Sequence, residues 1–227
     1  DLIERIHRIP GLERIRLGSL EPRIITEEFA GALAGLAKFC PHFHLSLQSG
    51  CDATLKRMNR HYTTEDYLRR CGILRKWFDH PAITTDVIVG FPGETQEEFE
   101  ITREFLKKVH FYEMHVFKYS KRAGTRAAVM PDQVPEQVKG RRSDVLLELE
   151  ASMSREYREH FIGSSVWVLF EDMAEVEGRK YIIGHTPQYV KAALAVKDGE
   201  ENRLSGQILC LKAAGLLGGD LLEVGWQ

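Results

Sequence analysis

Cysteine is scarce in this sequence of 227 residues, and the four copies are far apart. Cys40, Cys51, Cys71 and Cys210 form no CxxC or CxxxCxxC spacing, so they offer no recognisable ligand set for zinc or for an iron–sulfur cluster. We therefore predict no metal ligands in this chain and expect four separate, reduced thiols.

Long apolar runs are also missing. No segment approaches the roughly 20 apolar residues that cross a bilayer, and the N-terminus lacks the basic start and apolar core of a signal peptide. We predict a cytoplasmic protein with no membrane partner. The sequence opens at Asp1 inside an amphipathic segment, and we expect that further residues precede it in the natural protein.

Charge of one sign is not in excess, since the net charge is −2. Binding to nucleic acid would therefore depend on local patches. Two basic clusters stand out, and Tyr119 could add a stacking surface beside the second. The clusters are Lys56, Arg57, Arg60 and His61, then Lys118, Lys121, Arg122 and Arg126. The alternative for each cluster is a solvated, charge-balanced rim.

Helical and strand patterns alternate through the first part of the chain. Capping residues followed by helical apolar spacing predict helices over residues 26–40, 63–78 and 95–109. Short β-rich runs beginning at Arg14, His42, Ile83 and Met114 lie between them. This alternation predicts an α/β fold with a parallel sheet or barrel.

The run "HFHLSLQ" alternates polar and apolar residues, which places the two sets on opposite faces of a strand. If the apolar set packs on helices, His44, Ser46 and Gln48 face an interior cavity together with Asp86 of "ITTDVIVG". An interior lined with polar residues indicates an open barrel that holds a ligand. The alternatives are a closed polar network or a different strand phase.

The turn "GFPGET" leads from a strand into a helix, at the edge of the sheet where active sites collect. Gly90 and Gly93 would let the backbone approach a ligand, and free amides there could face an anion. An ordinary Gly and Pro turn is the alternative.

A long helix follows "MPDQVPEQV", and short strands separated by Gly and charged turns follow "FIGSS". We predict three regions: an α/β domain at 1–131, a connecting helix at 132–162 and a small all-β barrel at 163–227. The last region has six basic and nine acidic residues, which is unfavourable for gripping phosphate.

Five ordered segments carry a resemblance that covers nearly the whole chain: "RIRLGSLEP", "HLSLQSGCDATLKRMNRHYTTEDY", "ITTDVIVGFPGETQEEFE", "HVFKYSKRAGT" and "IGHTPQYV". In this order they resemble the radical S-adenosylmethionine methylthiotransferases that modify tRNA. "SLEP" with "LSLQSGCD" is most similar to the branch that adds a methylthio group to threonylcarbamoyladenosine beside the anticodon. The isopentenyladenosine branch more often has "PVQSGS" at that place.

The resemblance implies S-adenosylmethionine, two four-iron four-sulfur clusters, an electron donor and tRNA as cofactors and partners. It also implies a six-stranded radical domain and a terminal TRAM barrel. This sequence departs from that pattern, because it begins after the second strand, keeps four of the six strands and lacks both cluster-binding regions. We expect the chain alone to be inactive and to hold no cluster.

Site residues follow from the resemblance, although the catalytic residues stay unknown. Gln48 and Ser49 match the region that contacts the ribose, and Asp86, Val89 and Gly90 match the strand that flanks the adenine. Glu21 could contact the cofactor, or it could cap a helix or form an ion pair. The tRNA candidates are Arg57, Arg60, Tyr119, Lys121 and Arg122.

Two other functions remain open. A radical enzyme of the same kind could act on isopentenyladenosine or on a ribosomal protein, because "GFPGET" is shared among these branches. A polypeptide substrate would not demand basic clusters. The other possibility is a non-catalytic RNA-binding fragment.

Overall fold

The computed structural model describes residues 1–197 and 201–226. The chain divides into two compact units. The sheet unit comprises residues 17–37 and 43–153, and the barrel unit comprises residues 1–16, 38–42 and 154–227. The predicted boundaries at residues 131 and 162 stay a prediction.

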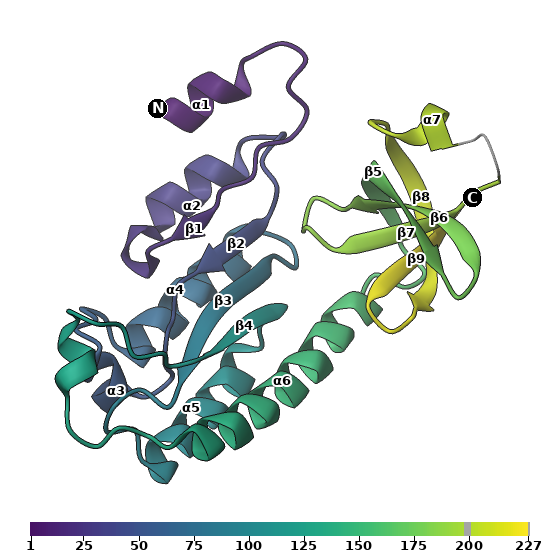
Figure 1. Ribbon diagram of the computed structural model, residues 1–227. Helices are drawn as coiled ribbons and strands as arrows, with labels where there is room; N and C mark the ends of the chain where they lie inside the picture. The colour runs from purple at the N-terminus through teal and green to yellow at the C-terminus, as the bar shows by residue number, and fades with distance from the viewer. Residues whose placement is uncertain (198–200, 227) are drawn as a thin grey trace. The chain divides into compact units, whose positions relative to one another are not determined.

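Four parallel strands form the sheet in the order β1, β2, β3, β4, as the strand and helix rhythm predicted (Figure 1). Their bounds are β1 Ser19–Leu20, β2 His42–Leu45, β3 Ala82–Val89 and β4 Glu113–Lys118. Parallel neighbours need crossover connections, and helices supply them here. All four strands therefore point their carboxyl ends toward the same edge.

The crossover helices begin where the capping residues predicted. Thr63 and Thr95 each accept a hydrogen bond from the backbone three residues on, and Asp66 and Glu98 complete capping boxes. These helices are α4 Thr64–Trp77 and α5 Gln96–Val109, which cover one face of the sheet with α2 Glu27–Ala34 (Figure 1).

The helix-covered face of the sheet carries the apolar set of β2. Phe43, Leu45 and Leu47 are completely buried. Phe43 meets Phe78 edge to face with 5.1 Å between ring centroids, and the Tyr67 hydroxyl donates to the Leu45 carbonyl at 2.9 Å. The strand phase predicted from the alternation is therefore confirmed on this face.

Two predicted elements are shorter than expected. The strand expected from Arg14 forms only at Ser19 and Leu20, with an isolated bridge from Ile15 to Phe39, because β1 is an edge strand with one neighbour. The helix predicted to reach residue 40 ends at Ala34, where Gly35 caps it. Glycine costs helix stability, which favours this early end.

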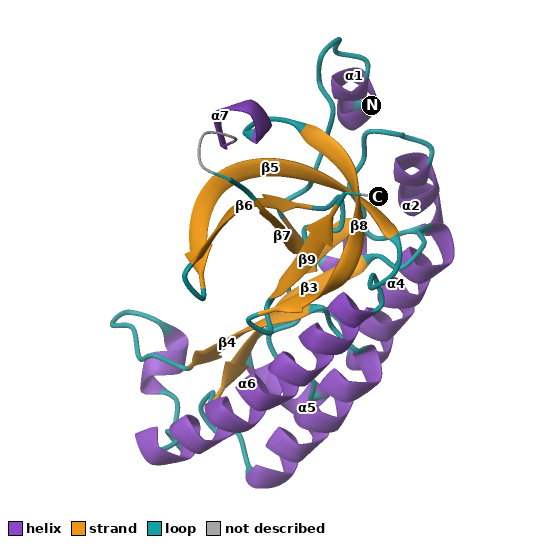
Figure 2. Cartoon of the chain, turned by 90° about the vertical axis from the view of Figure 1, so that its right-hand side faces the viewer, coloured by secondary structure: helices purple, strands orange, loops and turns teal. Residues whose placement is uncertain are grey.

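The barrel unit contains a closed barrel in the order β5, β6, β7, β9, β8 (Figure 2). Its strands are β5 Ser165–Val176, β6 Arg179–His185, β7 Lys191–Ala195, β8 Ile208–Leu217 and β9 Leu221–Gly225. A Cβ at Gly184 would overlap the Leu169 backbone, so the pairing of β5 with β6 needs glycine there. The predicted small β-barrel is confirmed.

The remaining elements are short apart from one long helix. Helix α6, Glu136–Glu159, is the helix predicted after "MPDQVPEQV". No helix in the described ranges, 1–197 and 201–226, is long and apolar enough to span a membrane. The short elements are α1 Leu2–His7, η1 Pro22–Ile24, α3 Asp52–Arg57, η2 Arg126–Val129 and α7 Glu201–Leu204.

Candidate functional site

A cavity of about 550 Å³ opens at the carboxyl ends of β3 and β4, on the face of the sheet opposite the helices. In parallel α/β sheets this edge is where ligands bind. Apolar side chains form much of its wall, and polar groups converge on it. The lining residues are Gln48, Asp86, Ile88, Phe91, Phe117, Lys118, Tyr119, Ser120, Arg122, Thr125 and Ala127.

Gln48 is held in a conformation that residues with a side chain rarely adopt. Its φ is 73°, in the left-handed region. Its amide donates to the Asp86 carbonyl at 2.9 Å, and its carbonyl accepts from the Ile88 amide at 2.9 Å. Such strain costs about 1–3 kcal/mol and persists only where surrounding contacts impose it, as both contacts with β3 do here. Strain of this kind is typical of ligand-binding positions.

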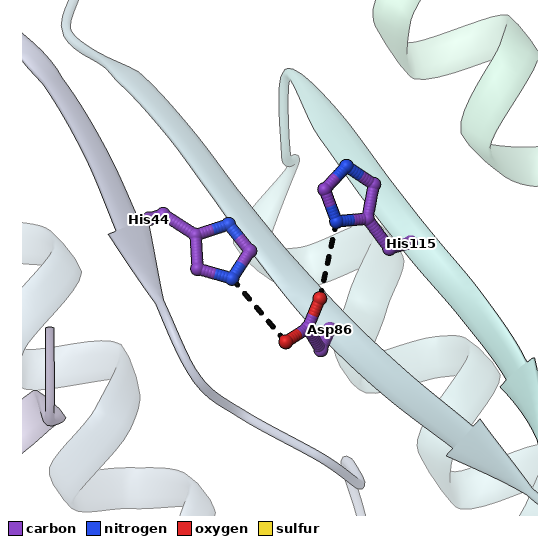
Figure 3. A group of neighbouring side chains, drawn as sticks. All are labelled: His44, Asp86 and His115. Carbon is purple, nitrogen blue, oxygen red and sulfur yellow. Dashed lines mark hydrogen bonds and ion pairs between the residues drawn. The ribbon is translucent and has the colours of Figure 1, made fainter. Parts of the chain in front are cut away.

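A polar cluster of His44, Asp86 and His115 lies on the same face (Figure 3). The two carboxylate oxygens of Asp86 reach the two rings separately: Oδ2 lies 3.4 Å from His44 Nε2, and Oδ1 lies 3.1 Å from His115 Nδ1. His44 Nδ1 also lies 3.0 Å from the Thr84 hydroxyl. The polar side of β2 therefore meets partners from β3 and β4.

His44, Gln48 and Asp86 therefore lie on the same face of the sheet, as the alternation predicted. The cavity lining includes Gln48 and Asp86, whereas His44 and Ser46 are half-buried and lie outside that lining. His115 and Phe117 were missed by the sequence reasoning. The available signal was the alternation of "EMHVFKY", which places His115, Phe117 and Tyr119 on one face of the strand. His115 is the residue of β4 that pairs with Asp86.

The turn after β3 uses its amides internally, contrary to the expectation that they face an anion. Gly90 donates to the Glu94 carboxylate, Gly93 to the Asp132 carbonyl and Glu94 to the Phe91 carbonyl. Gly90 has a φ of 70°, and a Cβ there would overlap the Lys139 side chain. The glycine is needed for close packing of α6. For these amides, the structure supports the alternative that the motif is an ordinary structural turn.

Glu94 is a buried acid beneath this turn. It lies 3.4 Å from Arg142, and both side chains are nearly inaccessible to solvent. Burial raises the pKa of Glu94, while Arg142 and the Gly90 and Phe91 backbone oppose that rise. The pair fixes α6 against the turn that shapes one wall of the cavity.

Arg57 is committed to internal bonds. Its guanidinium donates to both carboxylate oxygens of Glu98, to the Thr54 hydroxyl at 3.1 Å and to the Pro92 carbonyl at 3.2 Å. The bonds to Glu98 raise the pKa of Arg57 and those to Arg57 lower the pKa of Glu98. These bonds occupy the fork that would otherwise grip a substrate carboxylate.

The other residues predicted to contact the cofactor differ in burial and in hydrogen-bond partners. Ser49 is buried, and its hydroxyl lies 3.3 Å from the Thr102 hydroxyl and accepts from the Cys51 amide. Val89 is buried with its carbonyl bonded to the Tyr119 amide. Glu21 is exposed, makes no side-chain cap and pairs with Arg23 at 3.3 Å, which is the ion-pairing alternative.

The rim of the cavity carries Tyr119 and Arg122 of the predicted tRNA set. Tyr119 meets Phe91 edge to face at 5.3 Å, and its buried hydroxyl has no hydrogen-bond partner within the described part of the chain. Arg122 is exposed at the cavity wall. Lys121 and Arg60 are exposed outside the lining.

Comparison with known proteins shows which families this chain resembles. Residues 1–106 match the family model of the Radical SAM superfamily. The chain is 42% identical over 179 residues to tRNA-2-methylthio-N(6)-dimethylallyladenosine synthase of Acetivibrio thermocellus, covering 79% of this chain and 37% of that protein. Over most of its own length, this chain is therefore similar to part of a tRNA methylthiotransferase.

A second type of relative is equally similar. Threonylcarbamoyladenosine tRNA methylthiotransferase MtaB of Bacillus subtilis (strain 168) is 41% identical over 206 residues, covering 90% of this chain and 45% of that protein. The MtaB of Thermotoga maritima is 42% identical over 171 residues, covering 75% of this chain and 39% of that protein. The chain therefore spans less than half the length of the curated relatives it matches.

One solved structure supports the fold. The chain matches coproporphyrinogen III oxidase (HemN) from Escherichia coli with a TM-score of 0.50 and 21% identity, over 63% of this chain and 32% of that one. That structure is described as a radical SAM enzyme. At this identity the likeness concerns the α/β fold alone.

The family implies S-adenosylmethionine and four-iron clusters, and the two cofactors differ in how they fit this chain. The cavity, with its strained Gln48 and the unpartnered Tyr119 hydroxyl, fits a polar nucleoside. The cysteines do not fit a cluster: three are buried separately, and no group of three possible ligands in the described residues includes a cysteine.

Proposed function

We propose that this chain is the cofactor-facing and substrate-facing portion of a tRNA methylthiotransferase that modifies threonylcarbamoyladenosine beside the anticodon. The observation that carries the proposal is the cavity at the strand ends, which joins the strained Gln48 to an aromatic and basic rim. In the intact enzyme, bound S-adenosylmethionine would supply the methyl group and the radical chemistry of the reaction.

The chain's own residues would bind and orient the nucleosides. Gln48 offers both a donor and an acceptor to a ribose, and its backbone bonds to β3 keep it from rotating away. Phe91, Phe117 and Tyr119 give the cavity aromatic surfaces on which a base can stack. Closing this apolar wall around a bound nucleoside would keep water from a reactive intermediate.

Arg122 is the best placed receiver for the substrate carboxylate. Of the three arginines among the predicted tRNA contacts, Arg57 is bonded to Glu98 and Arg60 lies outside the cavity lining, whereas Arg122 lines it. A guanidinium can clamp a carboxylate with two parallel hydrogen bonds. The acidic threonylcarbamoyl group offers such a carboxylate, and the isopentenyl group offers none.

The alternative substrate is isopentenyladenosine. The apolar Ile88, Phe91 and Phe117 in the cavity wall favour it, and relatives of that type match this chain at the same identity as MtaB. The MtaB of Bacillus subtilis aligns over 90% of this chain, against 79% for the Acetivibrio synthase, which favours the threonylcarbamoyl branch. We also propose a cytoplasmic location and an electron donor for the intact enzyme.

Analysis of tRNA nucleosides by mass spectrometry tests the substrate. Cells that lack the intact protein should accumulate threonylcarbamoyladenosine without its methylthio group, and the intact protein should restore that group. Accumulation of isopentenyladenosine instead would show that the other branch is right. No change in either nucleoside would contradict a methylthiotransferase function.

Substitution of Arg122 tests the receiver. Arg122→Glu in the intact protein should lower methylthiolation of threonylcarbamoyladenosine by at least about tenfold, since about 1.4 kcal/mol of lost binding corresponds to that factor. Arg69→Gln is the matched control, because Arg69 is an exposed arginine on α4 that pairs with Asp66. Equal activities for the two variants would remove Arg122 from the site.

A further inference from the structure

The cluster of His44, Asp86 and His115 brings three side chains of metal-ligating type together from three neighbouring strands (Figure 3). One possible ligand atom from each residue lies within 4.8 Å of those of the other two. We propose that this cluster binds a divalent transition-metal ion such as Zn²⁺. The proposal does not rest on the enzymatic function proposed above, and the cysteine spacing gave no sign of it.

The donor set suits that class of ion. Two imidazoles and one carboxylate are a common ligand set for zinc, which takes nitrogen and oxygen ligands at about 2.0–2.1 Å in a tetrahedron. Atoms on neighbouring corners are then about 3.3–3.4 Å apart. The contacts of Asp86 run from different oxygen atoms, Oδ2 to His44 at 3.4 Å and Oδ1 to His115 at 3.1 Å. One ligand atom from each of the three residues lies within 4.8 Å of the others, so modest side-chain rotation is needed to reach the tetrahedral spacing.

The rings need only small rotations to converge on one ion. The His44 and His115 rings stack with 5.5 Å between centroids and 28° between planes. Rotation about the second side-chain torsion of histidine is soft, so the rings can turn their nitrogen atoms inward. The His115 side chain is 58% exposed and has room to turn, whereas His44 is 12% exposed and held in place.

Thr84 provides the outer support that metal-binding histidines usually have. Its hydroxyl lies 3.0 Å from His44 Nδ1. When Nδ1 donates a proton to Thr84, the lone pair of Nε2 is free for an ion on the side of Asp86. Without an ion, the hydroxyl can donate to Nδ1 and Nε2 can donate to Asp86, because a hydroxyl serves both roles.

The cluster adjoins the cavity through Asp86, which belongs to both. Three protein ligands leave the fourth position of a tetrahedral ion open, as in catalytic rather than structural zinc sites. Water, or an oxygen atom of a molecule bound in the cavity, would fill that position. The ion would also place positive charge at the wall where Gln48 and Asp86 meet.

Titration of Zn²⁺ into the tag-free chain of 227 residues, followed by calorimetry, tests the proposal. We expect one equivalent to bind, with affinity at least tenfold lower for each of His44→Gln, Asp86→Asn and His115→Gln. His61→Gln is the matched control, since His61 is an exposed histidine outside the cluster. Circular dichroism establishes that each variant is folded. No binding, or binding that the three variants leave unchanged, would overturn the proposal.

Two further measurements do not depend on those variants. Co²⁺ bound to the unaltered chain should show the visible bands of a four-coordinate site without a thiolate charge-transfer band, and a thiolate band would overturn the assignment. Thr84→Val should weaken Zn²⁺ binding by about 10–100-fold through loss of outer support. Thr85→Val, at the adjacent threonine on the opposite face, should leave the affinity unchanged.

Discussion

The two faces of strands β2 and β3 have different roles, and two adjacent threonines show the difference. Thr85 is completely buried on the helix side, where its hydroxyl donates to the Leu45 carbonyl at 2.5 Å and accepts from the Leu47 amide at 3.0 Å. Thr84 is also buried, but its hydroxyl contacts the ring of His44 on the cavity side. One hydroxyl joins two strands, and the other supports a polar cluster.

The comparison teaches that burial alone does not separate structure from function in this sheet. Apolar side chains on the helix side gain stability by leaving water. Polar side chains on the cavity side are kept although apolar residues would pack a complete barrel. We therefore expect the cavity side to contribute less to stability than the helix side and to hold the groups that can bind ligands. Substitutions on the two sides should separate these effects.

The largest expected effect is on the helix side. Leu45 is completely buried, so Leu45→Ala removes apolar contacts and leaves a cavity. We expect a loss of about 2–5 kcal/mol in the free energy of unfolding, measured by urea denaturation. Asp86→Asn, on the opposite face of β3, is the comparison and should cost less than about 1 kcal/mol. Similar losses for both variants would remove the distinction between the faces.

Thr85→Val sharpens the comparison at the level of one hydroxyl. The variant keeps the shape of the side chain but leaves the Leu45 carbonyl and Leu47 amide without this partner. A buried polar group that loses its partner costs about 1–3 kcal/mol. Thermal unfolding should show a lower Tm for Thr85→Val than for Thr84→Val. The reverse order would mean that the cavity side is the more important for stability.

Gln48→Gly should act in the opposite direction. Glycine adopts a positive φ freely, so the substitution relieves the strain at the end of β2. We expect the protein to become more stable by about 1 kcal/mol, at the lower end of the strain such a residue stores. A stability gain together with loss of enzymatic function would identify Gln48 as a residue retained for ligand binding. A clear loss of stability would show that its side chain is needed for the fold.

The smallest expected effect is on the loss of stability at acidic pH. The bonds from Arg57 lower the pKa of Glu98, so the unfolded chain binds this proton more tightly than the folded chain. The pair should therefore stabilise the protein above the ordinary glutamate pKa of about 4.3 and lose that contribution as the pH falls through the lowered value. Glu98→Gln should have a smaller drop in Tm on acidification. An unchanged acid dependence would contradict this assignment.

Local patterns predicted much of this fold. The capping residues at Thr63 and Thr95 located two helices, and the alternation in "HFHLSLQ" gave the correct strand phase because it is a property of neighbouring residues. The early end of α2 at Ala34 was harder to predict, since glycine is tolerated in many helices. The short β1 reflects the absence of a second neighbour in the sheet, and the expected loss of two strands did not say how far the edge strand would shorten.

The candidate site was less predictable, because its contacts join distant residues. Gln48 and Asp86 were found from the sequence, but the positive φ of Gln48 depends on two bonds to β3. The commitment of Arg57 to Glu98 joins residues 41 positions apart. The cluster with His115 depends on the pairing of β3 with β4, which places Asp86 beside His115 in register.

The most direct test of the account compares the two faces in the intact enzyme. Gln48→Ala on the cavity side and Leu45→Val on the helix side are introduced separately, and methylthiolated nucleoside in tRNA is measured per amount of folded protein. We predict that Gln48→Ala lowers the modified nucleoside at least about tenfold with little loss of stability, whereas Leu45→Val lowers stability and leaves the modification unchanged. Normal modification by Gln48→Ala, together with a loss of modification by Leu45→Val, would contradict the assignment of ligand binding to the cavity side.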